Sequence, residues 1–194
     1  SSMSAGGRSV RLGPRIVRIL RGGGWEVAVR LTTPGDDPAA LAAQVASDSI
    51  VAALGGDGYL GAVARGCHDS GALFVPFPGG RGNDLCRALG IGTDPLARAR
   101  DVASLGFVSG TAGDEAVAGR ARRATDALAS RVRPLDGMWV RSRDGVRLAL
   151  GVVSVGLDAR ANILANESSL TSGPLAYGYG AFAALASHEP TEII

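Results

Sequence analysis

The sequence predicts a mixed α/β fold, with a parallel-sheet domain first and the beginning of a β-rich domain after it. Short apolar runs alternate with segments of helical periodicity in the first half of the chain, which is the rhythm of a parallel sheet covered by helices. After residue 131, longer apolar stretches flank an Asp-Gly turn, which is typical of an antiparallel hairpin. We therefore expect an α/β domain over residues 1–130 and a partial β-rich domain with a returning helix over residues 131–194.

The elements of the first domain follow from apolar spacing and from Gly, Pro and Asp at the boundaries. Residues 11–21 place apolar side chains on one face of a helix, and the glycines at 22–24 end it. Asp37 and Pro38 are typical of a helix cap and a first helical position. The expected helices span residues 11–21, 38–47, 59–67, 81–90, 94–105 and 115–130, and the expected strands span residues 25–31, 49–54 and 72–77.

The elements of the second domain begin with the hairpin. We expect strands over residues 132–142 and 146–156, followed by helices over residues 157–167 and 173–187. The last residues of the chain read like the start of a strand, and a strand needs a partner. We therefore expect this domain to be incomplete at its C-terminus.

The composition excludes several classes of protein. Of the 194 residues, 46% are hydrophobic and 20% are charged, which is a globular composition. No apolar run is long enough for a transmembrane segment, and the Ser- and Gly-rich N-terminus is unlike a signal peptide. The net charge of +2 and the scattered arginines do not indicate a nucleic-acid partner. Cys67 and Cys86 are too few for a disulfide framework or a zinc site, so we expect reduced thiols in a cytoplasmic protein.

A glycine-rich turn over residues 55–58, Gly-Gly-Asp-Gly, joins an expected strand to an expected helix. Such turns lie at the sheet edge where α/β proteins bind ligands. Glycine admits a positive φ and lets an anion approach the backbone amides, and the following helix presents free N–H groups. Asp57 would repel a phosphate unless a cation lay between them. It therefore indicates either a bound Mg²⁺ or acid-base chemistry on a proton or a hydroxyl group. The alternative is a tight turn with a capping aspartate, which explains a lone turn of this kind equally well.

A second glycine-rich turn, over residues 79–82, follows the next expected strand. Arg81 supplies positive charge, and Asn83 offers donors and acceptors suited to a purine edge or a ribose. Asp84 is a candidate N-cap. Two parallel strands with such turns at one edge would form a single cleft. The turn is neither a Walker A loop, which needs Gly-Lys-Ser/Thr, nor a GxGxxG motif.

The two blocks GGDGY (55–59) and PGGRGNDLCRALGI (78–91) resemble the signatures of the diacylglycerol kinase catalytic domain family. That family usually has Gly-Gly-Asp-Gly-Thr and Pro-x-Gly-Thr-Gly-Asn-Asp-(Phe/Leu)-Ala-Arg-x-Leu-Gly-Ile. The N-terminal SMSAGGRS is similar to the end of its Asn-Pro-x-Ser-Gly-x-Gly block, and residues 151–167 and 173–185 resemble segments at its second domain. The wider superfamily includes sphingosine, ceramide and NAD kinases, and the Asn-Asp-x-x-Arg-x-Leu-Gly form favours the bacterial lipid kinase branch.

The resemblance implies a three-layer, NAD-kinase-like nucleotide-binding domain in a lipid kinase of diacylglycerol kinase type. The γ-phosphoryl group of ATP would pass to the hydroxyl of diacylglycerol or a related lipid alcohol, mainly through positioning and Mg²⁺ charge neutralisation. ATP and Mg²⁺ are the implied cofactors, with Asp57 as the catalytic residue and candidate metal ligand. The nucleotide-binding residues that it implies are Gly55, Gly56, Asp57, Gly58, Tyr59, Gly79, Gly80, Arg81, Gly82, Asn83, Ser4 and Gly6.

The resemblance also implies a cytoplasmic protein that is peripheral at the membrane surface during turnover. Its partner would be a lipid substrate, without nucleic acid, and a homodimer is compatible with it. Two readings stay open beside the lipid kinase. One is an NAD kinase, although the Asn-Glu pair typical of that branch occurs only at residues 166–167, away from the glycine-rich edge. The other is a nucleotide-binding homologue without kinase activity.

The chain departs from the family pattern in three places. Tyr59 stands where the family has Thr, so a small hydroxyl is replaced by a bulky ring. Arg81 also replaces a Thr, and its fixed charge could pair with a phosphate or fill the pocket. Ser1 and Ser2 stand where Asn-Pro would be. The Asp-Gly-Glu-like stretch that carries the family's general base is not found after residue 151, so we expect the general base to lie outside this chain.

Overall fold

The computed structural model describes residues 7–106, 131–143, 145–168, 170 and 173–187. The chain divides into two compact units, Ser1–Leu150 and Gly151–Ile194. The domain boundary expected at residue 130 stays a prediction. The helix expected over residues 115–130, the strand start expected in the last residues, and Ser4 and Gly6 lie outside the described residues.

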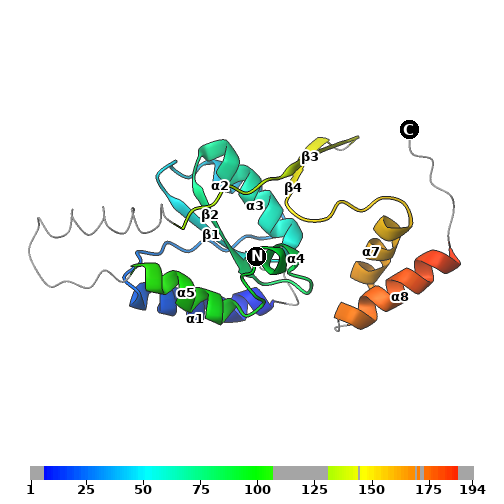
Figure 1. Ribbon diagram of the computed structural model, residues 1–194, viewed down its shortest axis with the longest axis horizontal. Helices are drawn as coiled ribbons and strands as arrows, with labels where there is room; N and C mark the ends of the chain where they lie inside the picture. Colours follow the sequence, from blue (N-terminus) through cyan, green and yellow to red (C-terminus); the bar gives the residue numbers. More distant parts are fainter. Residues whose placement is uncertain (1–6, 107–130, 144, 169, 171–172, 188–194) are drawn as a thin grey trace, which may run out of the picture. The chain divides into compact units, whose positions relative to one another are not determined.

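The first unit contains a parallel pair of strands, β1 (Ile50–Gly55) and β2 (Leu73–Pro78), with α3 (Asp57–Ser70) between them in the chain (Figure 1). The pairing runs in register from Ile50 opposite Leu73 to Gly55 opposite Pro78. The expected α/β class with a parallel sheet is therefore confirmed, and within the described residues this sheet has two strands. The unit's other helices are α1 (Arg8–Gly22), α2 (Pro38–Ala43), α4 (Asp84–Ala88) and α5 (Pro95–Gly106).

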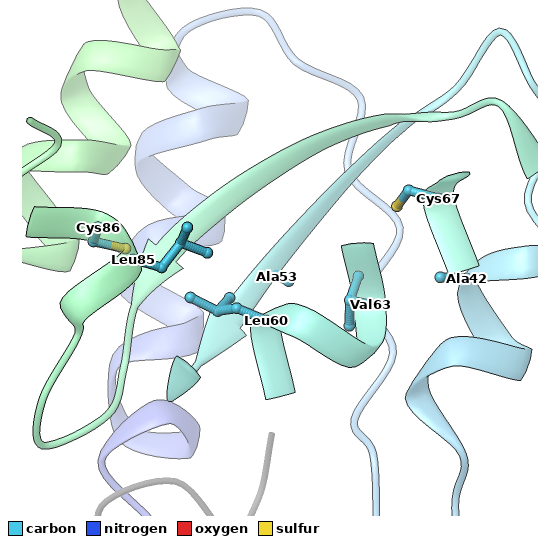
Figure 2. Close-up of a cluster of buried hydrophobic side chains, with 7 residues drawn as sticks. All are labelled: Ala42, Ala53, Leu60, Val63, Cys67, Leu85 and Cys86. Carbon is cyan, nitrogen blue, oxygen red and sulfur yellow. The ribbon is translucent and has the colours of Figure 1, made fainter. Parts of the chain in front are cut away.

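Alternate residues of the two strands contact two separate apolar clusters, because successive side chains of a strand point to opposite faces. Ala53 belongs to the first cluster, which α2, α3 and α4 complete, and Phe77 belongs to the second, which α1 and α5 complete. Figure 2 shows the first cluster, which consists of Ala42, Ala53, Leu60, Val63, Cys67, Leu85 and Cys86. The side chains of Leu60 and Phe77 are fully buried, which stabilises the unit by about 1.5–3 kcal/mol each. The strand ends are therefore held from both faces.

The segment over residues 25–31 is not a strand, contrary to the sequence prediction. Its alternation is real: Trp25 and Val27 pack against the second cluster, and the Trp25 indole donates to the Val102 carbonyl at 3.1 Å. Val29 and Leu31 are 60% and 64% exposed, and this segment pairs with no strand of the described chain. The alternation of apolar and polar residues predicts an extended segment with one buried face. It does not show whether another strand lies beside that segment to form backbone hydrogen bonds with it.

A short helix begins where the sequence predicts it. The Asp37 carboxylate accepts from the Ala39 amide at 2.9 Å, and Pro38 takes the first helical position of α2. This is the expected N-cap. The helix ends at Ala43, earlier than the predicted residue 47.

The predicted hairpin is confirmed, although its strands are shorter than expected. Strand β3 (Met138–Ser142) pairs antiparallel with β4 (Gly145–Ala149). The guanidinium of Arg65, in α3, donates to the Val146 carbonyl at 2.8 Å, so the hairpin is bonded to α3 within the first unit. In the second unit, α7 (Leu157–Glu167) and α8 (Gly173–Ala186) form where the sequence predicts helices, and they pack against each other. In the described part of the chain, every helix is too short or too polar to cross a membrane.

Candidate nucleotide-binding site

Both glycine-rich turns lie at the carboxyl edge of the parallel strand pair. Because β1 and β2 are parallel and in register, the turn after Gly55 and the turn after Pro78 emerge side by side. The Gly79 amide donates to the Gly55 carbonyl at 2.8 Å and so extends the ladder into the second turn. The sequence prediction that the two turns share one edge is therefore correct.

The glycines of these turns allow two backbones to touch. A Cβ on Gly80 would lie 2.5 Å from the Gly56 Cα, and a Cβ on Gly79 would lie 2.8 Å from the Gly55 nitrogen. Glycine admits a positive φ, but none of the glycines at 55, 56, 58, 79, 80 and 82 takes one. Close approach, not left-handed backbone, is what requires glycine here.

The positive φ in the turns belongs to Asn83, with φ 56° and ψ 40°, at the N-cap of α4. Its Oδ1 accepts from the Gly80 amide at 2.8 Å, and its Nδ2 donates to the Gly80 carbonyl at 3.0 Å. The residue is 4% exposed. Asn tolerates the left-handed region better than most residues. The Asn83 amide therefore fixes the shape of the second turn from within, rather than standing open as a free donor and acceptor.

Asp57 joins the two turns. Its Oδ1 accepts from the backbone amide of Leu85, in the first turn of α4, at 3.0 Å. A Cβ on Gly82 would lie 3.3 Å from the other oxygen, Oδ2, and 3.1 Å from the Oδ2 of Asp84. Two carboxylates thus lie close to Gly82. Asp57 is a capping residue, but for the neighbouring helix instead of its own turn.

Asp84 does not cap α4, because Asn83 occupies the N-cap and Asp57 supplies the carboxylate. The Asp84 side chain instead pairs with Arg87 at 3.3 Å on the exposed face. Arg81 is exposed at the tip of the turn, so it does not fill a buried space. Gly58, in the first turn of α3, is exposed and has no atom within 4 Å of the position a Cβ would take.

Tyr59 packs against the first turn. A Cβ on Gly55 would lie 2.9 Å from the Tyr59 Cγ, so the ring covers the glycine. The Tyr59 hydroxyl lies 3.5 Å from the Oγ1 of Thr32, which is 7% exposed. The ring also contacts the first apolar cluster. Tyr59 therefore anchors the extended segment near residue 32 to the end of β1.

Ser9 is a residue that sequence reasoning missed. It lies in the first turn of α1, is 4% exposed, and its Oγ has no hydrogen-bond partner within the described ranges. A Cβ on Gly79 would lie 2.8 Å from that oxygen. A serine at a helix start normally indicates an exposed cap, but the cap position here is Gly7, so only the packing reveals the burial of Ser9.

Cys86 lies in the first apolar cluster, close enough to Asp57 to feel its charge, and its thiol is unreactive. Burial and, to a smaller extent, the Asp57 charge raise the pKa of its thiol and Arg98 opposes them, with a resulting pKa of about 11. Burial likewise raises the pKa of the Cys67 thiol to about 11. Thiols with such pKa values are protonated at neutral pH and are poor nucleophiles. Both are free cysteines, as the sequence predicts.

The described residues contain no group of three or more His, Cys, Asp or Glu side chains that could hold a metal ion by themselves. A Mg²⁺ ion does not require such a group, because it is commonly bound by one or two carboxylates together with substrate phosphates and water. The carboxylates of Asp57 and Asp84, which both lie close to Gly82, fit that pattern.

The comparison with protein families gives a match. A family model described as diacylglycerol kinase catalytic domain matches residues 2–114, which includes both glycine-rich turns and α1. Neither the curated proteins nor the solved structures give a match.

Proposed function

Because the chain belongs to the diacylglycerol kinase catalytic domain family, we propose that it transfers the γ-phosphoryl group of ATP to a lipid alcohol. The proposed acceptor is the hydroxyl of diacylglycerol or a related lipid. The observation that carries the proposal is the contact between the two glycine-rich turns, bridged by the hydrogen bond from the Leu85 amide to Asp57. This contact builds one backbone surface from two turns at the sheet edge where α/β proteins bind ligands.

We assign the phosphates of ATP to the turns at residues 55–58 and 79–82. Glycine lets a phosphate approach the backbone closely, although the amides of Gly79 and Gly80 already donate to Gly55 and Asn83. The positive end of the α3 dipole adds attraction for an anion. The exposed guanidinium of Arg81 can form a charge-assisted hydrogen bond with a phosphate oxygen. Asn83 supports this surface from within, through its two hydrogen bonds to Gly80. In this proposal Ser4 and Gly6 add contacts from the N-terminal segment.

Asp57 is the proposed Mg²⁺ ligand, with Asp84 close enough to assist. The Oδ2 atoms of both carboxylates face Gly82, whereas the Asp57 Oδ1 is already bonded to the Leu85 amide. Bound Mg²⁺ would neutralise charge on the phosphates. In the overall reaction, the lipid oxygen forms a bond to the γ-phosphorus, the bond from that phosphorus to ADP breaks, and the hydroxyl proton is released.

The same proposal extends to the fold and to the place of action. The helices on both faces of β1 and β2 support a three-layer, NAD-kinase-like nucleotide domain. A lipid acceptor requires the protein to work at a membrane surface, so we propose a cytoplasmic protein that is peripheral at the membrane during turnover.

The direct test uses the full-length gene product with ATP labelled in the γ-phosphate, Mg²⁺, and diacylglycerol in mixed micelles. The expected result is labelled phosphatidic acid, lost in Asp57→Asn and retained in Asp48→Asn. Asp48 is an exposed carboxylate away from the turns, so it controls for loss of a charge. Labelling of NAD instead would favour an NAD kinase, and nucleotide binding without transfer to any alcohol would favour a homologue without kinase activity.

A further inference from the structure

Four exposed arginines share one face of α1, and we call them the arginine stripe: Arg11, Arg15, Arg18 and Arg21. Successive members are three or four positions apart, so the helix brings them to one side, within an arc of roughly 120°. With the arginine at position 8, five of the chain's 20 Lys and Arg residues lie in this one helix. Arginines that look scattered in the sequence therefore form a stripe once the helix is folded.

The charge of the stripe is not neutralised by nearby carboxylates. α1 contains no Asp or Glu, and the chain has none before Glu26. No ion pair joins a stripe arginine to any described carboxylate. The guanidinium of Arg21 donates to a neutral group, the Val27 carbonyl, at 2.8 Å. α5, which packs beside α1, carries two arginines and one aspartate, so it does not compensate for the charge.

The stripe is on the side of α1 that the core does not use. Ile16 and Leu20 belong to the second apolar cluster, and each is 6% exposed. Like charges three or four positions apart repel one another and destabilise a helix. The spacing of the arginines is therefore unfavourable in the free protein, and an anionic partner would remove that repulsion.

A surface of anionic lipid headgroups matches the stripe better than a nucleic acid does. The four arginines extend along about 15 Å of a helix, and clusters of basic residues on an amphipathic helix are typical of binding to anionic lipids. α1 has no aromatic side chain to stack on a base and no Asn or Gln to read a base edge. Since its apolar side is buried in the core, the helix would bind through charge without inserting into the bilayer.

We propose that the arginine stripe of α1 binds the anionic headgroups of a membrane surface. The choice of a lipid surface rests on the proposed function, whereas the exposed, uncompensated charge is a property of α1 itself. The first turn of α1 lies beside the second glycine-rich turn, because a Cβ on Gly79 would lie 2.8 Å from the Ser9 Oγ. Binding through α1 therefore keeps the candidate nucleotide site close to the membrane.

The test measures sedimentation of the full-length gene product with vesicles, in the absence of ATP and diacylglycerol. One set of vesicles is phosphatidylcholine alone, and the other is equal parts of phosphatidylcholine and the anionic lipid phosphatidylglycerol. The test variant carries Arg11→Gln and Arg18→Gln, because glutamine removes the charge and keeps a high helix propensity. The matched control carries Arg141→Gln and Arg143→Gln, which remove the same charge from two exposed positions at the hairpin.

The wild type is expected to bind the anionic vesicles, to leave the neutral ones free, and to be released as the salt concentration rises. Each arginine near an anionic surface changes affinity by about fivefold, so the test variant should bind about tenfold or more weakly. The control should bind as the wild type does. A variant with Arg11→Lys and Arg18→Lys should also keep its binding, since lysine retains the charge. The Tm of the test variant should equal or exceed that of the wild type, because repulsion within α1 is reduced.

Equal losses in the two glutamine variants, equal binding of the wild type to neutral and anionic vesicles, or a lower Tm in the test variant would each overturn the proposal. A wild type that binds a duplex RNA but no anionic vesicle would do so as well, and would assign the stripe to a nucleic acid. If the stripe binds anionic vesicles but no lipid is phosphorylated, the inference holds and the proposed function fails. If diacylglycerol in micelles is phosphorylated but anionic vesicles are not bound, the proposed function holds and the inference fails.

Discussion

The carboxylate of Asp57, at the start of α3, accepts a hydrogen bond at 3.0 Å from the backbone amide of Leu85, at the start of α4. The two residues are 28 positions apart, and each lies in the first turn of a helix that follows a glycine-rich turn. One carboxylate oxygen therefore holds the second turn in place, and the other, Oδ2, lies by Gly82. A structural role and a role in binding are thus combined in one side chain, and substitutions can separate them.

Asp57→Asn is expected to remove phosphoryl transfer while the protein stays folded. An amide oxygen can still accept from Leu85, but the negative charge for Mg²⁺ is gone. Asp57→Ala removes the cap as well and should lower the free energy of unfolding by about 1 kcal/mol. Urea unfolding and the transfer assay on both variants check this. Retained transfer in Asp57→Asn would remove the charge of Asp57 from the mechanism.

Gly80→Ala is expected to lower the free energy of unfolding by about 1–3 kcal/mol. The new Cβ would lie 2.5 Å from the Gly56 Cα, and a backbone atom cannot move aside as a flexible side chain can. Gly58→Ala is the matched control, because its Cβ would meet open space within a helix and should stabilise by up to about 1 kcal/mol. Equal unfolding free energies for the two variants, measured in urea, would contradict the close contact between the turns.

Asn83→Gly and Asn83→Ala separate the hydrogen bonds from the backbone conformation. Glycine keeps the left-handed φ of 56° but loses both bonds to Gly80, at about 0.5–1.5 kcal/mol each. Alanine loses the same bonds and also meets the left-handed strain, about 1 kcal/mol more. The expected order of unfolding free energies is wild type, then Asn83→Gly, then Asn83→Ala. The reverse order of the two variants would show that φ is not positive there.

Gly55 and Tyr59 are expected to be energetically coupled. Gly55→Ala places a Cβ against the Tyr59 ring and should cost about 1–3 kcal/mol in the wild type. The same change should cost clearly less in a Tyr59→Ala background, where the ring is absent. A double-mutant cycle on unfolding free energies measures this coupling. Additive effects would mean that the ring does not cover Gly55.

Much of the first unit could be predicted from the sequence. Asp37-Pro38 marks the start of α2, the apolar runs mark β1 and β2, and the glycines after them mark the edge that carries the candidate site. These features are local, because caps, turns and period-two runs depend on neighbouring residues. The strand predicted over residues 25–31 was wrong because the pairing of a strand depends on residues far away in the chain, which local patterns do not report.

The site was predictable in its residues but not in their roles. The signature blocks identify Asp57, Asn83 and the glycines. The hydrogen bond between Asp57 and Leu85 and the bond between Asn83 and Gly80 can be seen only in the folded structure. Tyr59 appeared as a replacement for a threonine, and its place over Gly55 explains how the chain accommodates the larger ring. Ser9 gave no signal in the sequence, because burial and the absence of a partner are properties of packing.

The two buried thiols are expected to make stability fall at alkaline pH. The pKa of Cys67 and that of Cys86 rise from 9.0 to about 11 on folding, so the protonated thiol is favoured in the folded state. Below pH 9 the thiols are protonated in both the folded and the unfolded state, so they make their full contribution to the free energy of unfolding. Between pH 9 and about 11 the unfolded chain ionises first, so the free energy of unfolding falls as pH rises.

The sequence has no lysine and three tyrosines, so few other groups titrate in this range. Urea unfolding at pH 8, 9 and 10 should show a steeper decline for the wild type than for a double variant carrying Cys67→Ala and Cys86→Ala, whose overall stability is lower. Parallel declines would show that the folded thiols titrate like exposed ones.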